Sequence, residues 1–140
     1  MKKVSIIIPL YNLEKLIGKC IASALAQDLS PEEYEILVID DGSTDGSLAA
    51  AEKAAQGHPN LHVYTKPHEG LSRTRNYGTD RAAGRYVMYL DADDYLEPNV
   101  LGRLVETMEC GGLDMLCFEI AGIDENGNDV PLWSDGISAG

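Results

Sequence analysis

The sequence predicts an α/β domain built on a mostly parallel sheet with helices on both faces. Short apolar runs alternate with longer segments whose apolar residues recur at helical spacing, the pattern of repeated strand–helix–strand units. The apolar runs show no polar alternation, which is typical of parallel strands that are buried on both faces. At 140 residues, the chain has the length of a single domain with a substantial core.

Each predicted strand is an apolar run that ends in a turn signal. Pro9 interrupts the end of the first run, Asp-Asp-Gly follows the second, and Asp91 ends the fourth. The sequence "ENGN" at residues 125–128 indicates a hairpin turn after the fifth. In chain order, the predicted strands are residues 3–12, 34–40, 61–67, 85–91 and 113–120.

The predicted helices follow from their period and from their end signals. Asn12 is placed to cap the first helix, and Ser43 or Thr44 can cap the second. Gly84 ends the third, and Pro98 opens the fourth as its first residue. In chain order, the predicted helices are residues 13–25, 44–55, 71–83 and 98–110.

The charge balance narrows the classes of partner. The net charge of −12 argues against nucleic acid, because phosphate backbones are held by an excess of Lys and Arg. A small anionic ligand would need a cation or a local basic group to mediate its binding. No Lys or Arg follows Arg103, although many acids do, so the final segment is expected to be a solvated acidic face or one side of an interface.

Several features bear on location. No apolar run has the length needed to span a bilayer, and no cleavage site follows the apolar start of the chain. The cysteines, Cys20, Cys110 and Cys117, show no CxxC spacing, so a disulfide framework or a zinc site is not expected. We therefore expect a cytoplasmic protein, or one at the inner face of a membrane.

The histidines have no metal-ligand spacing and are expected on the surface or in loops: His58, His62 and His68.

Polar residues gather just past the carboxyl ends of the strands, where this architecture binds its ligands. The fourth strand runs into "DADD", where Asp91 and Asp93 project to the same side of an extended backbone. A hard divalent cation takes such carboxylate oxygens together with substrate phosphates, so we interpret these two residues as metal ligands rather than as a turn. Asp94 and Glu97 are interpreted as the start of the next helix.

Other candidates leave alternatives open. An acid that ends the second strand can accept hydrogen bonds from a ribose or a base, but the pattern does not distinguish Asp40 from Asp41, and an Asx turn also explains either. Arg75 shares a helical stripe with Leu71, so it is expected to face inward and to pair with a ligand phosphate or, structurally, with an aspartate. Tyr11 leaves the first strand beside the site and could lie along a base.

Four motifs, in this order and spacing, closely resemble the inverting glycosyltransferases of family 2: "SIIIPLYN", "ILVIDDGSTD", "GLSRTRNYG" and "YVMYLDADD". The resemblance covers roughly residues 3–120. It implies a Rossmann-like GT-A fold, a nucleotide-diphosphate-sugar donor (most commonly a UDP-sugar) and a bound Mn²⁺ or Mg²⁺. It also implies transfer, with inversion, to a hydroxyl of a saccharide or lipid-linked acceptor, as in polysaccharide biosynthesis.

The resemblance assigns roles to matching positions. Tyr11 and Pro9 would line the base pocket, Asp41 would contact the base, and Asp91 would approach the ribose. Asp93, together with Asp91, would hold the metal on the diphosphate. The positions that match the nucleotide-binding residues of the family are Pro9, Tyr11, Asp41, Arg75 and Asp91.

The sequence departs from the family pattern in two places. Thr74 stands where Ala is usual, which we expect to be harmless. The catalytic base, a carboxylate that deprotonates the acceptor hydroxyl while the metal takes up charge on the leaving diphosphate, has no recognisable counterpart. We expect it beyond Gly140, so that residues 1–140 are a single donor-binding domain without most of the acceptor-binding half. A nucleotide-sugar-binding module without turnover, or an inactive fragment, is the alternative.

Two other α/β classes fit less well. A dinucleotide-dependent dehydrogenase needs a glycine-rich turn after the first strand, and "PLYNLEKLIG" has none. A phosphoacceptor receiver domain needs an acidic pair at the same place, where this chain has Tyr11-Asn12.

Overall fold

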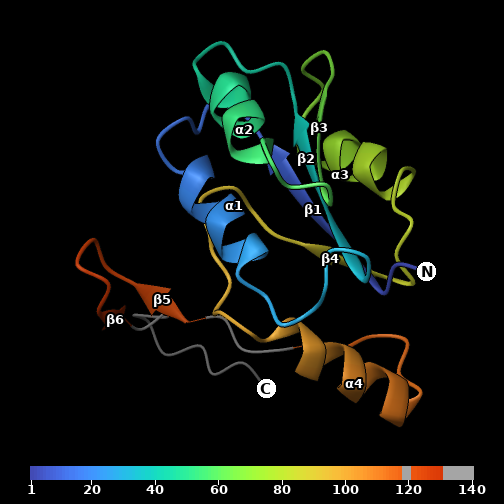
Figure 1. Cartoon of the computed structure of the whole chain (residues 1–140). Helices are drawn as coiled ribbons and strands as arrows, with labels where there is room; N and C mark the ends of the chain where they lie inside the picture. The colour runs from blue at the N-terminus through green and yellow to red at the C-terminus, as the bar shows by residue number, and fades with distance from the viewer. Residues whose placement is uncertain (118–120, 131–140) are drawn as a thin grey trace.

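The computed structural model describes residues 1–117 and 121–130. Its centre is a sheet of four parallel strands in the order β3-β2-β1-β4 (Figure 1). The strands are β1 (Val4–Leu10), β2 (Tyr34–Asp40), β3 (Leu61–Thr65) and β4 (Tyr86–Tyr89). The helices are α1 (Ile17–Leu25), α2 (Ser47–Ala55), α3 (Leu71–Thr79) and α4 (Leu101–Gly111). The predicted alternation of strands and helices and the parallel sheet are confirmed.

The two central strands form the buried middle of the sheet. Every residue of β1 and β2 is buried, which explains why their sequences show no polar alternation. Two polar side chains in this layer bond to each other, since Ser5 Oγ donates to Glu35 Oε1 at 2.5 Å. The same Glu35 oxygen accepts the N–H of Ala83 at 2.7 Å, so the buried carboxylate has two donors.

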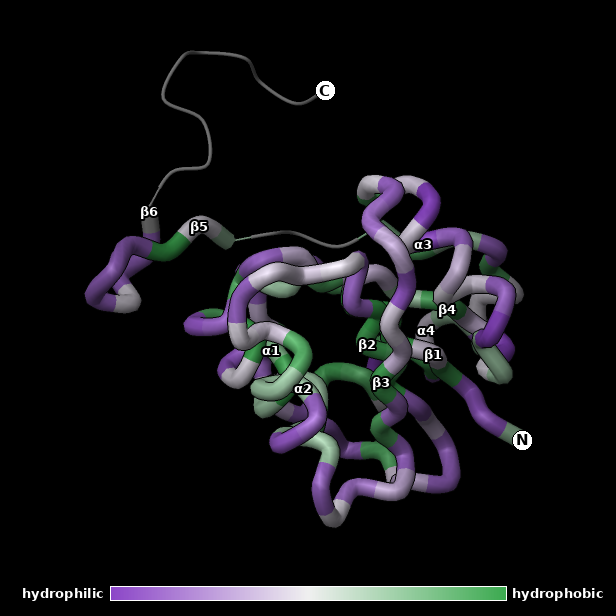
Figure 2. The backbone as a smooth tube through the Cα atoms, turned by 90° about the horizontal axis from the view of Figure 1, so that it is seen from above, coloured by the Kyte–Doolittle hydropathy of each residue, from purple (hydrophilic) through white to green (hydrophobic). Residues whose placement is uncertain are grey.

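Helices cover both faces of the sheet, as predicted. On one face, Ile6, Ile8 and Val38 belong to the larger core, which includes buried residues of α1, α2 and α4. The other face is covered by α3 (Figure 1). Ile7 and Ile39 form the smaller core there, close to Gly78 of this helix. Figure 2 shows hydrophobic colour along the central strands and hydrophilic colour in many of the surrounding loops. The core therefore lies in the two layers that flank β1 and β2.

The helices begin or end at residues other than those predicted. Asn12 has a φ of +50° and does not cap α1, which begins at Ile17 after a turn. Neither Ser43 nor Thr44 caps α2, because that helix begins at Ser47. The third helix, α3, ends at Thr79 rather than at residue 83.

The fourth helix also begins later than predicted, at Leu101, so neither Asp94 nor Glu97 starts it. Its first N–H groups are instead satisfied from the segment after α1. Gln27 Oε1 accepts the N–H of Leu101 at 3.2 Å, and Asp28 Oδ1 accepts that of Gly102 at 2.8 Å. Side chains distant in the sequence thus replace the local cap that the pattern suggested.

The last part of the chain differs most from the prediction. Residues 113–117 form no strand, so the predicted fifth strand is wrong there, and residues 118–120 lie outside the described residues. The predicted hairpin is confirmed, since β5 (Gly122–Ile123) and β6 (Asp129–Val130) pair antiparallel. Across the parts of the chain described, no helix has both the length and the apolar character needed to cross a bilayer.

Candidate functional site

A cavity of about 310 Å³ opens at the carboxyl edge of the sheet. Its lining comes from the ends of β1 and β2, from the turn after β4 and from the start of α3. The strand-end segments that the sequence singled out therefore meet in space, as expected for a parallel sheet. Five of the predicted site residues line this cavity: Pro9, Tyr11, Asp41, Asp91 and Asp93.

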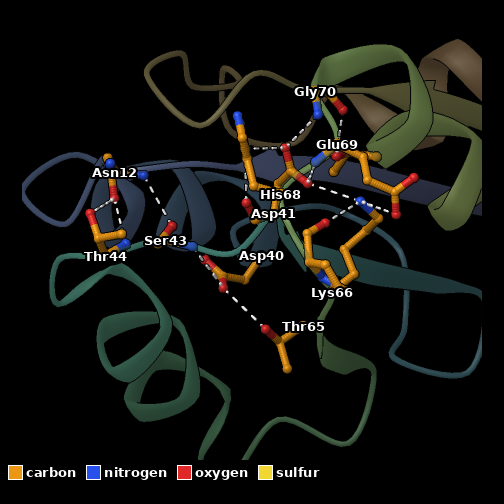
Figure 3. Close-up of polar contacts among 12 residues, drawn as sticks. Asn12, Asp40, Asp41, Ser43, Thr44, Thr65, Lys66, His68, Glu69 and Gly70 are labelled. Carbon is orange, nitrogen blue, oxygen red and sulfur yellow. Dashed lines mark hydrogen bonds and ion pairs between the residues drawn. The ribbon is translucent and has the colours of Figure 1, made fainter.

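Asp41 lies at the centre of a buried polar cluster (Figure 3). Its side chain is 5% exposed, and Oδ1 accepts a hydrogen bond from Lys66 Nζ at 2.9 Å. The N–H of Glu69 donates to Oδ1 at 2.9 Å, and the N–H of Gly70 donates to Oδ2 at 3.0 Å. Burial alone raises the pKa of Asp41, but Lys66 and these N–H groups outweigh it and hold the pKa at about 2. The carboxylate is therefore ionised and fixed in position.

Asp40 points away from this cluster, which resolves the choice that the sequence left open. Its Oδ2 accepts hydrogen bonds from Thr65 Oγ1 at 3.2 Å and from the N–H of Ser43 at 3.3 Å (Figure 3). Consecutive residues of an extended chain project to opposite sides, so only one of the two acids can face the cavity. Asp41 is that residue.

The histidine in the loop before α3 also belongs to the site. The ring of His68 stacks on Tyr11, with ring centroids 4.2 Å apart and 23° between the planes. His68 Nδ1 lies 2.9 Å from Asp41 Oδ2 and 3.2 Å from the carbonyl oxygen of Asp41. Gly42 permits this approach, because a Cβ there would lie 2.9 Å from the backbone nitrogen of His68.

Sequence reasoning missed the roles of Lys66 and His68. Lys66 directly follows β3, so the strand-end criterion applied to the acids would have identified it. His68 is exposed and lies in a loop, as expected, but no spacing rule connects it to Tyr11 or Asp41. Its contacts arise from the crossing of segments that are far apart in the sequence.

Three carboxylates gather in the turn after β4. Asp91, Asp93 and Asp94 each offer an oxygen within 4.8 Å of the others. The backbone here is a turn rather than extended, since the N–H of Asp94 donates to the carbonyl oxygen of Asp91 at 2.9 Å. Burial raises the pKa of Asp94, and the negative charges of Asp93 and Asp91 raise it further. Asp94 thus joins the cluster from which the sequence analysis had separated it.

Arg75 supplies positive charge to this cluster. Its Nη2 donates to Asp91 Oδ1 at 3.1 Å, and the two side chains are 36% and 48% exposed. The predicted inward stripe is wrong for Leu71, which is 51% exposed. Thr74 and Gly78 form the buried side of α3, with Arg75 at its margin.

The donor set of the acidic turn suits a hard divalent cation. Three carboxylates and one guanidinium leave an excess of two negative charges. Carboxylate oxygens are the ligands that Mg²⁺ and Mn²⁺ prefer, and all three carboxylates are accessible at the cavity edge or beside it. Asp91 and Asp93 line the cavity, so they are the two that can present a cation to its contents.

Thr74, which replaces the usual Ala, is accommodated without an unsatisfied group. The residue is completely buried, and its Oγ1 donates to the carbonyl oxygen of Gly70 at 2.7 Å. The hydroxyl is therefore satisfied within its own helix, and the residue lies in the cavity wall.

Comparison with known proteins places the chain in a family. The model of glycosyl transferase family 2 matches residues 5–135. EpsJ of Bacillus subtilis (strain 168), an uncharacterized glycosyltransferase, is 40% identical over 113 residues, which cover 81% of this chain and 32% of EpsJ. The chain spans about a third of the length of this relative.

Solved structures support the same family. Two structures of S. aureus TarS 1-349, one in complex with UDP and one with UDP-GlcNAc, each superpose on this chain with a TM-score of 0.82 and 34% identity. Each match covers 92% of this chain, and they cover 38% and 37% of the two TarS chains respectively. The mannosyltransferase PcManGT from Pyrobaculum calidifontis, in complex with GDP-Man and Mn²⁺, matches with a TM-score of 0.68 and 27% identity over 76% of this chain and 31% of its own. With a family model that matches almost its whole length, this chain belongs to glycosyl transferase family 2 and has the GT-A fold.

Proposed function

We propose that the cavity binds a nucleotide-diphosphate-sugar donor, a UDP-sugar, and that the enzyme transfers the sugar to an acceptor hydroxyl with inversion. The observation that carries this proposal is a single cavity lined by two kinds of acidic group. The ionised carboxylate of Asp41 is fixed in position at one part of the cavity, and the acidic turn after β4, whose carboxylates suit a metal ion, lies at another. The similarity to TarS, which was solved with UDP and with UDP-GlcNAc, supports a uridine donor. Because the chain spans about a third of its relatives, donor binding is proposed for this chain and transfer for the whole enzyme.

Tyr11, Pro9 and Asp41 would form the nucleobase end of the site. Tyr11 is 42% exposed, and its ring offers an apolar face against which a base can stack. Asp41 offers an ionised acceptor whose position is fixed by Lys66 and by two backbone N–H groups. A carboxylate at this position accepts from a base that carries a ring N–H, as uracil does.

Asp93 and Asp91 would form the diphosphate end, holding Mn²⁺ or Mg²⁺. The mannosyltransferase structure with Mn²⁺ supports a divalent metal in a protein of similar fold. When bound, such an ion neutralises charge on the departing diphosphate. Arg75 orients Asp91 through their 3.1 Å contact and adds positive charge beside the diphosphate.

We propose that this domain acts in the cytoplasm, in polysaccharide biosynthesis. The proposed acceptor is a saccharide or a lipid-linked molecule. The described cysteines Cys20, Cys110 and Cys117 are free thiols, which suits a reducing compartment. The catalytic base is proposed to lie outside residues 1–140, and the rival function is a binding module without turnover.

Calorimetric titration with UDP, GDP and CDP, with and without Mn²⁺, tests donor binding. The proposal expects UDP to bind most tightly and Mn²⁺ to strengthen its binding. Equal binding of the three nucleotides would contradict the uridine assignment. Turnover of a UDP-sugar panel by the whole enzyme then separates a transferase from a binding module, which would bind UDP but turn over none of the donors.

A further inference from the structure

The contacts of His68 reproduce those that a nucleobase would make. An aromatic ring with a nitrogen at its edge stacks on Tyr11, with centroids 4.2 Å apart. The Nδ1 atom at that edge faces the carboxylate of Asp41 at 2.9 Å (Figure 3). Both contacts are on residues that the proposed function assigns to the base.

We propose that His68 occupies the nucleobase position of the ligand-free protein and must turn away before the donor binds. The inference rests on the proposed function, since it assumes that Tyr11 and Asp41 receive the base. It makes His68 a residue that sets nucleotide affinity.

The hydrogen on Nδ1 of His68 adds to the similarity between this ring and a nucleobase. Nδ1 lies within 3.2 Å of two oxygens of Asp41, the carbonyl oxygen and carboxylate Oδ2. Both oxygens are acceptors, so Nδ1 must carry a hydrogen, as the N3 of uracil does.

The two rings leave no space for a base between them. Stacked rings with centroids 4.2 Å apart are already in contact, and a third ring would require roughly twice that separation. A base that stacks on this face of Tyr11 and bonds to Asp41 must therefore displace His68, not join it.

Displacement of His68 leaves the rest of the site intact. Its side chain is 53% exposed, so the ring can rotate into solvent without opening the core. Asp41 keeps its bonds from Lys66 and from the N–H groups of Glu69 and Gly70. The neighbouring backbone is held by those same bonds, so the movement is confined to one side chain.

Calorimetric titration of His68→Ala with UDP, beside wild type and His58→Ala, tests the proposal. His58 is an exposed histidine between α2 and β3, so its removal controls for the loss of a histidine. If His68 leaves the position free in roughly one molecule in ten, its removal tightens UDP binding about tenfold. We expect at least about a threefold fall in the Kd of UDP for His68→Ala and no change for His58→Ala.

A further readout separates competition from a structural role. In wild type, the imidazole NMR signals that His68→Ala lacks should move when UDP is added. An unchanged or weaker UDP affinity in a folded His68→Ala overturns the proposal, as do imidazole signals that ignore UDP. Absence of UDP binding by wild type and by His68→Ala would instead overturn the proposed function.

Discussion

The guanidinium of Arg75 meets the carboxylate of Asp91 at 3.1 Å and so joins α3 to the acidic turn after β4. This contact explains in part how Asp91, Asp93 and Asp94 can lie with carboxylate oxygens within 4.8 Å of one another. One positive charge balances one of the three acids, while burial and its acidic neighbours raise the pKa of Asp94. The proposed binding of a cation depends on the remaining negative charge.

Replacing Arg75 with Met should weaken UDP binding far more than it weakens the fold. Both partners of the Arg75–Asp91 pair are partly exposed, so its loss should change the free energy of unfolding by less than about 1 kcal/mol. Without the guanidinium, Asp91 should lose its orientation at the cavity, and the proposed diphosphate site should lose positive charge. Urea unfolding and calorimetry with UDP and Mn²⁺ measure the two effects.

Arg73→Met is the matched control for that substitution. Arg73 lies on the same helix, is 73% exposed and pairs with Glu69 rather than with the acidic turn. It should leave UDP affinity within about twofold of wild type, a difference under 1 kcal/mol. Equal losses of affinity in the two variants would show that Arg75 acts only through the general charge of α3.

Removing one partner of the buried Asp41–Lys66 pair should destabilise the protein strongly. Each side chain is only 5% exposed, so Lys66→Met leaves the buried Asp41 carboxylate without the ammonium group that pairs with it. The expected cost is about 3–5 kcal/mol in the free energy of unfolding, measured in urea at pH 7. The double variant Asp41→Asn, Lys66→Met should recover part of this loss, and a double variant no more stable than Lys66→Met would contradict the pairing.

The same pair gives stability a defined dependence on pH. The pKa of folded Asp41, about 2, lies below the ordinary 3.8, so the unfolded chain binds this proton more tightly. The stabilisation is therefore complete above about pH 4 and is lost as the pH falls toward about 2. Between these limits, the unfolding free energy of wild type should fall more steeply than that of Asp41→Asn. Parallel curves would show that Asp41 contributes nothing to acid unfolding.

Two helical glycines should respond to Ala in opposite directions. A Cβ at Gly78 would lie 2.6 Å from Ile7 Cγ2, so Gly78→Ala must push α3 away from the sheet and cost about 1–3 kcal/mol. A Cβ at Gly18 in α1 would meet nothing within 4 Å, so Gly18→Ala should stabilise by about 0.5–1 kcal/mol through helix propensity. Thermal unfolding of both variants tests the close packing of α3, and a neutral Gly78→Ala would contradict it.

The sequence predicted the sheet well because strands buried on both faces need apolar residues throughout. Strands β1 to β4 lie within their predicted segments, and the alternation of strands and helices required them to be parallel. The start of α3 at Leu71 was predicted correctly, but the other three helices begin three or four residues later than predicted. Their starts were missed because partners of the first N–H groups come from distant segments. Gln27 and Asp28 serve α4 in this way, and no local pattern reports such contacts.

The candidate site was also predicted only in part. The ends of the predicted strands identified Tyr11, Asp41, Asp91 and Asp93, because a parallel sheet brings those ends together. The pattern could not choose between Asp40 and Asp41, since that choice depends on which way the chain turns after β2. His68 was missed because its stacking on Tyr11 joins two loops through tertiary contact alone.

The most direct test of donor binding is calorimetry of UDP with Asp93→Asn, with and without Mn²⁺. Asp80→Asn, which removes an exposed acid at the end of α3, is the control for the change in charge. In wild type and in Asp80→Asn, Mn²⁺ should strengthen UDP binding by about tenfold or more, whereas in Asp93→Asn it should have little effect. If UDP binds equally well without the metal, and Asp93→Asn binds it as wild type does, the acidic turn does not hold a cation on the diphosphate.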